Sequence, residues 1–173
     1  MKTYNSQEEL KADVKNGLLT KKDSITLTFD ELVMKGSIYC KELIAPKTKL
    51  DIRGNIECKV MEAYSLDARN IIAKERITVE KEIEAWNIRT KTLMCSEKLR
   101  AVEKINAVKI IVEDGDVYTD YLKAESLYCN NILVHRLLVD NISYKKSCVA
   151  TKTLRYKQIL GRAKNAEHML FRI

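Results

Sequence analysis

Histidine, which is common both in acid–base catalysis and as a metal ligand, is rare in this 173-residue sequence. There are two histidines, and His135 directly follows Val134 at a corner, where we expect it to be exposed. The run from Glu113 to Asp116 could hold a cation, although an isolated acidic turn is far more often a solvated corner. The sequence contains no P-loop, glycine-rich phosphate loop or nucleophile elbow. We therefore expect a protein without enzymatic activity, metal ion or cofactor.

The five cysteines are the remaining candidates for metal or redox chemistry, and none of them forms a C-x-x-C pair. Four occupy positions of the repeat described below that need a small apolar side chain, namely Cys40, Cys58, Cys95 and Cys129. We expect reduced thiols in the core, as is usual in a reducing compartment. Because no apolar run is long enough for a membrane span or a signal peptide, we expect a soluble cytoplasmic protein.

Basic residues are concentrated at the C-terminal end. Residues 145–173 carry eight Lys or Arg against Glu167 alone, which accounts for the whole net charge of +7. These cations alternate with Tyr156 and Phe171, a composition that suits nucleic acid, an acidic groove on a protein, or solubility alone. The predicted partner-binding residues of this tail are Lys145, Lys146, Lys152, Arg155, Lys157, Arg162 and Lys164.

The elements that must position these residues form a repeat. Between Ile38 and Ile142 an apolar residue recurs every five to seven positions, and a small or β-branched residue usually follows it two positions later. Positions i and i+2 of an extended chain point to the same side, so each unit predicts a short strand with both residues facing inward. Short strands separated by turns wind into an all-β, single-stranded β-solenoid, also called a β-helix. The leading inward residues are expected to be Ile38, Leu43, Leu50, Ile56, Met61, Leu66, Ile71, Ile77, Ile83, Ile88, Leu93, Leu99, Ile105, Ile110, Val117, Leu122, Leu127, Ile132, Leu137 and Ile142.

The number of strands in each coil follows from the spacing of these leading residues. Taking every fourth one gives coils of 22 or 23 residues, whereas taking every third gives coils of 15 to 18. Because stacked coils need nearly equal lengths, we favour four sides over three, with about five coils of ~22 residues. Three sides remain the alternative, since extra residues can bulge outward at corners.

Both ends of a solenoid require caps, because bare ends expose unpaired backbone and core side chains. Near the N-terminus Ser6 and Glu9 form a capping-box signature for a short helix, and Gly17 is expected to end that helix. The predicted division is residues 1–35 for an N-terminal cap of helix and strand, 36–144 for the solenoid and 145–173 for a basic C-terminal cap or tail.

On the four-sided register, one outward row is apolar. A contiguous exposed apolar patch usually marks an interface, so we expect a homodimer paired side by side through this row. A terminal segment folded back over the row is the alternative. The predicted self-association residues are Ile72, Met94, Tyr118 and Leu138.

Three stretches, at residues 69–73, 83–88 and 140–144, resemble the repeats of a known family. They are similar to the N-I-x-A-x pentapeptide-like solenoid proteins encoded by phages and prophages of Gram-positive bacteria, and the resemblance covers nearly the whole chain. In that family a short helical segment precedes the repeats, and a basic tail with a cysteine and a G-R-R-x-N-x-x-H-like stretch follows them. Cys148 and residues 161–168 look similar, although Ala163 stands where that stretch has its second arginine. The resemblance implies action in the host-cell cytoplasm.

Our leading expectation for function is a non-enzymatic solenoid that binds a macromolecule, with a protein target and no membrane. The phage setting implied by the resemblance makes interference with a bacterial host or defence factor, such as a CRISPR nuclease, a reasonable expectation. Two alternatives remain open. One is nucleic-acid binding through the basic tail, and the other is a structural rod that self-assembles.

Overall fold

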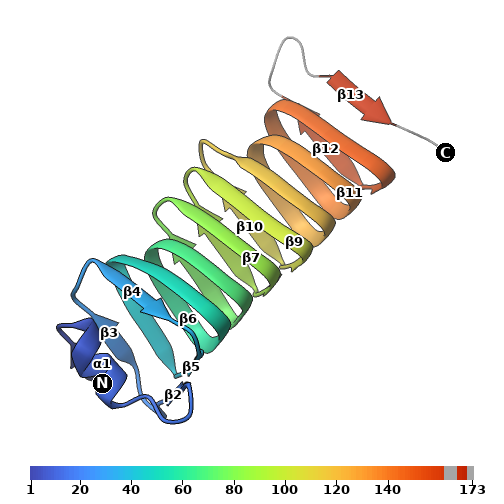
Figure 1. The fold of residues 1–173 in the computed structure, drawn as a ribbon. Coiled ribbons are helices and arrows are strands. Elements are labelled where there is room, and N and C mark those ends of the chain that lie inside the picture. Colours follow the sequence, from blue (N-terminus) through green and yellow to red (C-terminus); the bar gives the residue numbers. More distant parts are fainter. Residues whose placement is uncertain (162–166, 171–173) are drawn as a thin grey trace.

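The chain winds into a rod of stacked β-coils in the computed structural model, which describes residues 1–161 and 167–170 (Figure 1). The rod has about eight turns, and nearly all of its neighbouring strands are parallel. This confirms the predicted β-solenoid. No helix in the described part of the chain is long and apolar enough to cross a membrane.

One short helix and a series of parallel strands make up the rod. Two of the strands, β6 and β11, are each longer than two coils because the chain keeps strand geometry as it turns the corners. The elements are β1 (Lys2–Tyr4), α1 (Gln7–Ala12), β2 (Leu18–Thr20), β3 (Ile25–Leu27), β4 (Glu31–Met34), β5 (Ser37–Tyr39), β6 (Glu42–Val79), β7 (Glu82–Arg89), β8 (Thr92–Cys95), β9 (Lys98–Asn106), β10 (Lys109–Val112), β11 (Asp116–Arg155), β12 (Gln158–Gly161) and β13 (Glu167–Leu170).

The coils have three sides, so the preference for four sides of ~22 residues was wrong. Ile77 of β6 pairs with Leu93 of β8, which pairs in turn with Ile110 of β10. Ile88 of β7 likewise pairs with Ile105 of β9. Neighbouring coils are therefore offset by about 17 residues, and every third leading residue stacks on the one before it.

Each side of the rod is a flat parallel sheet, and we name the three sides by their inward residues. The first face contains Ile38, Ile56, Ile71, Ile88, Ile105, Leu122 and Leu137; the second face contains Leu43, Met61, Ile77, Leu93, Ile110, Leu127 and Ile142; the third face contains Leu50, Leu66, Ile83, Leu99, Val117 and Ile132.

Extra residues are accommodated at one corner. The two seven-residue steps, from Leu43 to Leu50 and from Ile110 to Val117, both lie between the second and third faces. Steps between the other faces are five or six residues long. The coil length varies mainly because this corner bulges outward, and smaller register shifts occur between the third and first faces where β9 pairs with β7 and with β11.

The core is a single apolar column running along the axis. All twenty predicted leading residues are buried, and so are the small residues that follow them, except for the partly buried Cys40. Tyr144, two positions after Ile142, is also buried and is only 1% exposed. All five cysteines are free, and Cys58, Cys95, Cys129 and Cys148 are buried, as expected of core thiols.

The helix α1 lies at the N-terminal end of the rod (Figure 1). Ser6 caps it, because the Ser6 hydroxyl accepts a hydrogen bond from the backbone N–H of Glu9 at 3.2 Å. The helix ends at Ala12, earlier than predicted, and Gly17 instead adopts a φ of +74° in the turn before β2. Leu10 is fully buried and anchors the helix to the first coils.

The predicted boundary at residue 144 falls inside a strand. β11 runs without a break from Asp116 to Arg155, and its residues Cys148 and Ala150 continue the buried column. β12 and β13 then pair with β11 in parallel. Residues 145–161 therefore belong to the solenoid itself and are not a separate tail.

Candidate functional site

The predicted basic tail is spread around the rod. Lys145 and Lys146 lie at the corner after the second face, and Lys152 lies at the corner after the third face. Only Arg155 and Lys157 line the groove on the first face described below. Arg162 and Lys164 are outside the described residues. The cations that are adjacent in the sequence thus do not form one binding surface.

Lys145 has local partners. Its Nζ lies 3.1 Å from Asp114 Oδ1 and donates to the carbonyl oxygen of Glu113 at 2.9 Å, and it also lies 5.6 Å from the centre of the Tyr128 ring. Hydrogen bonding to Asp114 raises the pKa of Lys145. This lysine therefore fastens the corner between the second and third faces.

The predicted apolar row is also dispersed. Ile72 and Leu138 lie on the first face, Met94 on the second and Tyr118 on the third. Met94 pairs with Thr78 and Ile111, not with Tyr118, because the register has three sides. The four residues do not form one patch. Homodimerisation and self-assembly into larger rods stay predictions, and the apolar row no longer supports them.

The acidic corner from Glu113 to Asp116 is occupied by protein contacts. Asp116 Oδ1 accepts a hydrogen bond from Asn131 at 2.7 Å, and Asp116 Oδ2 accepts one from Tyr118 at 2.9 Å. Within residues 1–161 and 167–170, no group of three or more His, Cys, Asp or Glu residues is placed to hold a metal ion. His135 is exposed at a corner, as predicted, beside Thr151 and Asp120.

Cationic side chains gather on the first face. To compare the faces, we take three outward positions around each inward residue: the residue before it, the residue after it and the third residue after it. For the first face the series is extended to Leu154. This set holds three carboxylates, Glu57, Glu125 and Asp140. The same count gives three cations against four carboxylates for the second face and five against six for the third. The cations of the first face, all exposed, are Lys41, Lys59, Lys74, Arg89, Lys91, Lys104, Lys123, Arg136, Arg155 and Lys157.

Most cations of the first face have no carboxylate partner. Of these ten cations, only Lys59 and Lys157 form ion pairs with described residues. Lys59 pairs with Glu75 at 3.2 Å, and Lys157 pairs with Asp140 at 2.8 Å. Hydrogen bonding to Asp140 raises the pKa of Lys157. On the other two faces and the corners beside them, cations are more often paired, as in Arg76–Glu62 at 2.9 Å, Lys98–Glu84 at 2.6 Å and Lys81–Glu97 at 3.6 Å.

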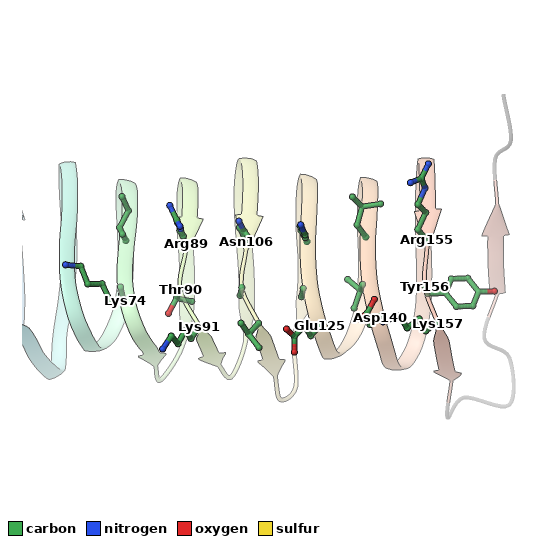
Figure 2. Close-up of a pocket in the computed structure, with 18 of the residues that line it drawn as sticks. Lys74, Arg89, Thr90, Lys91, Asn106, Glu125, Asp140, Arg155, Tyr156 and Lys157 are labelled. Carbon is green, nitrogen blue, oxygen red and sulfur yellow. Dashed lines mark hydrogen bonds and ion pairs between the residues drawn. The ribbon is translucent and has the colours of Figure 1, made fainter.

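Six of these cations line an open groove that crosses the coils, namely Lys74, Arg89, Lys91, Lys123, Arg155 and Lys157. Figure 2 shows Arg89 and Arg155 in a row with Asn106, and Lys91 and Lys157 near a second row at the adjoining corner. The sheet positions these rows, because Arg89 pairs with Asn106, which pairs in turn with Lys123. The arrangement presents positive charge along the rod axis at the coil spacing of ~4.8 Å.

A ladder of asparagine side chains forms the other edge of this face. Asn70 Nδ2 donates to Asn55 Oδ1 at 2.8 Å, and Asn87 Nδ2 donates to Asn70 Oδ1 at 3.1 Å. Asn87 also donates to Glu103 at 3.0 Å. These bonds run parallel to the axis and connect successive coils, so they hold the corner beside the first face in register.

Comparisons with known proteins give no relative for this chain. No protein-family model, no curated protein and no solved structure matches it.

We propose below a role for the first face, which the sequence reasoning missed. Up to residue 144, cations and carboxylates are equal in number, so the linear sequence gave no sign of a basic surface outside the tail. The basic face becomes visible in the sequence when residues about 17 positions apart, one coil length, are compared. Lys41, Lys59, Lys74 and Lys91 each stand three positions after a leading residue of the first face.

Proposed function

We propose that this chain is a non-enzymatic protein that binds an anionic macromolecule along the first face of the solenoid. The observation that carries the proposal is the separation of charge: ten exposed cations and three carboxylates occupy this face, and eight of the ten have no ion pair among the described residues. Separation of charge onto one flat side produces a positive potential that attracts and orients a polyanionic partner.

The unpaired state of the cations supports binding more strongly than their number does. An exposed ion pair contributes little to stability, so pairing on the other faces mainly neutralises those surfaces. Lys74, Lys91 and Lys123 keep their charge available to a partner, because no carboxylate in the described chain compensates it. A rigid sheet also holds them at fixed spacing, which lowers the entropy lost on binding.

We propose further that the bound macromolecule is a bacterial host or defence factor, such as a CRISPR nuclease, which the chain blocks by covering it. This part rests on the resemblance to phage-encoded solenoid proteins. A nuclease bound to its guide and target carries RNA and a displaced DNA strand, whose phosphates would complement a basic face.

Retention on heparin tests the proposal with a defined polyanion. The test variant carries Lys74→Glu, Lys91→Glu and Lys123→Glu, which reverses three unpaired charges in the groove. We expect it to elute at a much lower salt concentration than the unchanged protein, because bound phosphate- or sulfate-like groups release fewer counterions. Circular dichroism should show the same strand content.

A matched control variant has the same net charge as the test variant, but its three changes lie elsewhere on the rod. Lys35→Glu, Lys47→Glu and Lys146→Glu change exposed lysines that line no groove of the first face, and none of the three has an ion pair among the described residues. The control should elute close to the unchanged protein. Equal losses in both variants would show that only net charge matters and would overturn the proposal.

A further inference from the structure

One column of the first face carries a lysine on each of four successive coils. Lys41, Lys59, Lys74 and Lys91 all lie at the corner that follows this face, and all four line the same surface groove. The backbone N–H of Lys59 donates to the carbonyl oxygen of Lys41 at 2.8 Å, which shows the direct stacking of their coils. The lysines are exposed and recur at the coil spacing of ~4.8 Å.

Aromatic rings stand beside the charges at both ends of this face. Tyr39 lines the groove of the lysine column together with Lys41, whereas Tyr156 lines the groove of Figure 2 together with Arg155 and Lys157. Tyr156 is 46% exposed, and Figure 2 shows its ring extending beyond Arg155 and Lys157 in the direction of the C-terminal end. Tyr39 is partly buried and Tyr156 is exposed. Accessible rings next to a row of cations are the two components that sequence-independent binding of single strands uses.

We propose that a single-stranded nucleic acid lies lengthwise on the first face, with its phosphates along the lysine column and, beyond it, along Lys123 and Arg155, because Glu125 and Asp140 occupy the column's position on later coils. Its bases stack on Tyr39 and Tyr156. This inference rests on the proposed function and names its partner. A nucleic-acid strand repeats one negative charge every ~3.4 Å along a helix axis and can extend further when unpaired. A row of lysines at ~4.8 Å suits such a regular polyanion better than it suits the irregular charges of a folded acidic protein.

The flanking rings favour a single strand over a duplex. Bases in a duplex are stacked on each other and present only their edges, whereas unpaired bases can stack on exposed tyrosines. The amide of Asn106, in the middle of the face, adds a donor and an acceptor that can bond to any base or sugar. The site is therefore expected to bind strands with little sequence preference.

Fluorescence anisotropy with a labelled twenty-nucleotide oligo(dT) tests the inference over a series of salt concentrations. We expect Lys41→Gln, Lys74→Gln and Lys91→Gln together to weaken binding at least tenfold and to reduce the slope of log affinity against log salt by roughly 2, at ~0.7 for each lost phosphate contact. The control Lys35→Gln, Lys47→Gln, Lys146→Gln should stay within twofold of the unchanged protein.

The tyrosines give an independent measurement. Tyr156→Ala should weaken oligo(dT) binding several-fold, while Tyr156→Phe, which keeps the ring, should not. Neither change should alter retention on heparin, which has no bases. An oligo(dT) duplexed with oligo(dA) should bind more weakly than the single strand at equal salt and should be insensitive to Tyr156→Ala.

The outcomes separate this inference from the proposed function. Suppose oligo(dT) fails to bind, or polyglutamate of equal charge competes with it equally well, while heparin retention still depends on Lys74, Lys91 and Lys123. The inference of a nucleic-acid partner is then overturned and the basic binding face stands. If heparin retention itself does not depend on those lysines, the proposed function fails.

Discussion

The side-chain amide of Asn87 donates from Nδ2 to Oδ1 of Asn70 on the preceding coil, at 3.1 Å. Asn70 in turn donates to Asn55 at 2.8 Å, so a line of amide hydrogen bonds crosses three coils beside the first face. Asn70, the middle amide, uses one donor and one acceptor along the axis, so removing it breaks both bonds at once. The ladder is thus a second set of contacts, in addition to the backbone, that fixes the stacking of coils.

Replacing the middle amide should destabilise the rod. We expect Asn70→Ala to lower the free energy of unfolding by about 1–2 kcal/mol, since two partly buried hydrogen bonds are lost and two partners are left unsatisfied. Urea denaturation measures the change. Asn106→Ala is the control: Asn106 is also partly buried, has no side-chain hydrogen bond among the described residues, and should cost less than ~0.5 kcal/mol.

Gly115 is required by the close approach of two coils. A Cβ atom placed there would lie 1.4 Å from the carbonyl oxygen of Glu97 on the preceding coil. We expect Gly115→Ala to cost about 3 kcal/mol, because the backbone at this corner must move. Gly17→Ala makes a graded control: its Cβ would meet only the Cα of Gly36 at 3.9 Å, and the positive φ should cost about 1 kcal/mol. A larger effect at Gly17 than at Gly115 would contradict this stacking of the coils.

The positions of the core residues were predictable from the sequence, and the number of sides was not. An inward residue must be apolar in either register, so the pattern from Ile38 to Ile142 identified the buried set whatever the coil length. The error came from requiring equal coils. The seven-residue steps at Leu43–Leu50 and Ile110–Val117 bulge at one corner, which leaves the strand stacking unaffected.

The candidate site could not be predicted before the register was known. Whether Arg89 lies beside Asn106 or beside Ile111 depends on whether the coil has three sides or four. Only the three-sided register aligns Lys41, Lys59, Lys74 and Lys91 at one corner. Composition alone directed attention to the C-terminal residues, of which Arg155 and Lys157 do reach the first face.

Burial of the thiols makes stability depend on pH in the alkaline range. Desolvation raises the pKa of Cys58 and Cys95 to about 12, above the ordinary thiol value near 9. Below pH ~9 the thiols are protonated whether the chain is folded or unfolded. As the pH rises from ~9 towards ~12, only the unfolded state ionises, so we expect the free energy of unfolding to fall.

Urea midpoints at pH 8, 9 and 10 measure this decline, and a variant with Cys58→Ala and Cys95→Ala should show a shallower one. An equally steep decline in that variant would assign the effect to other groups. At pH 8 a disulfide reagent such as dithionitrobenzoate should label the buried thiols only when the chain unfolds, whereas the partly exposed Cys40 should react first.

The stacked core residues should not tolerate a charge. Ile105 is fully buried and pairs with Ile88 and Leu122 on the neighbouring coils. We expect Ile105→Asp to prevent cooperative folding, because an unpaired carboxylate would enter the apolar column. Ile105→Val should cost only about 0.5–1.5 kcal/mol. A soluble Ile105→Asp protein with an unchanged melting transition would show that this residue does not face inward.

The central claim is that a polyanionic partner covers the first face, and lysine footprinting tests it most directly. Acetylation of individual lysines is followed by mass spectrometry with and without a saturating heparin dodecasaccharide. The account predicts strong protection of Lys74, Lys91 and Lys123. The acetylation rates of Lys35, Lys47 and Lys146, which are also exposed but do not line the groove, should be unchanged. Uniform protection of all six lysines, or protection of the second set alone, would contradict it.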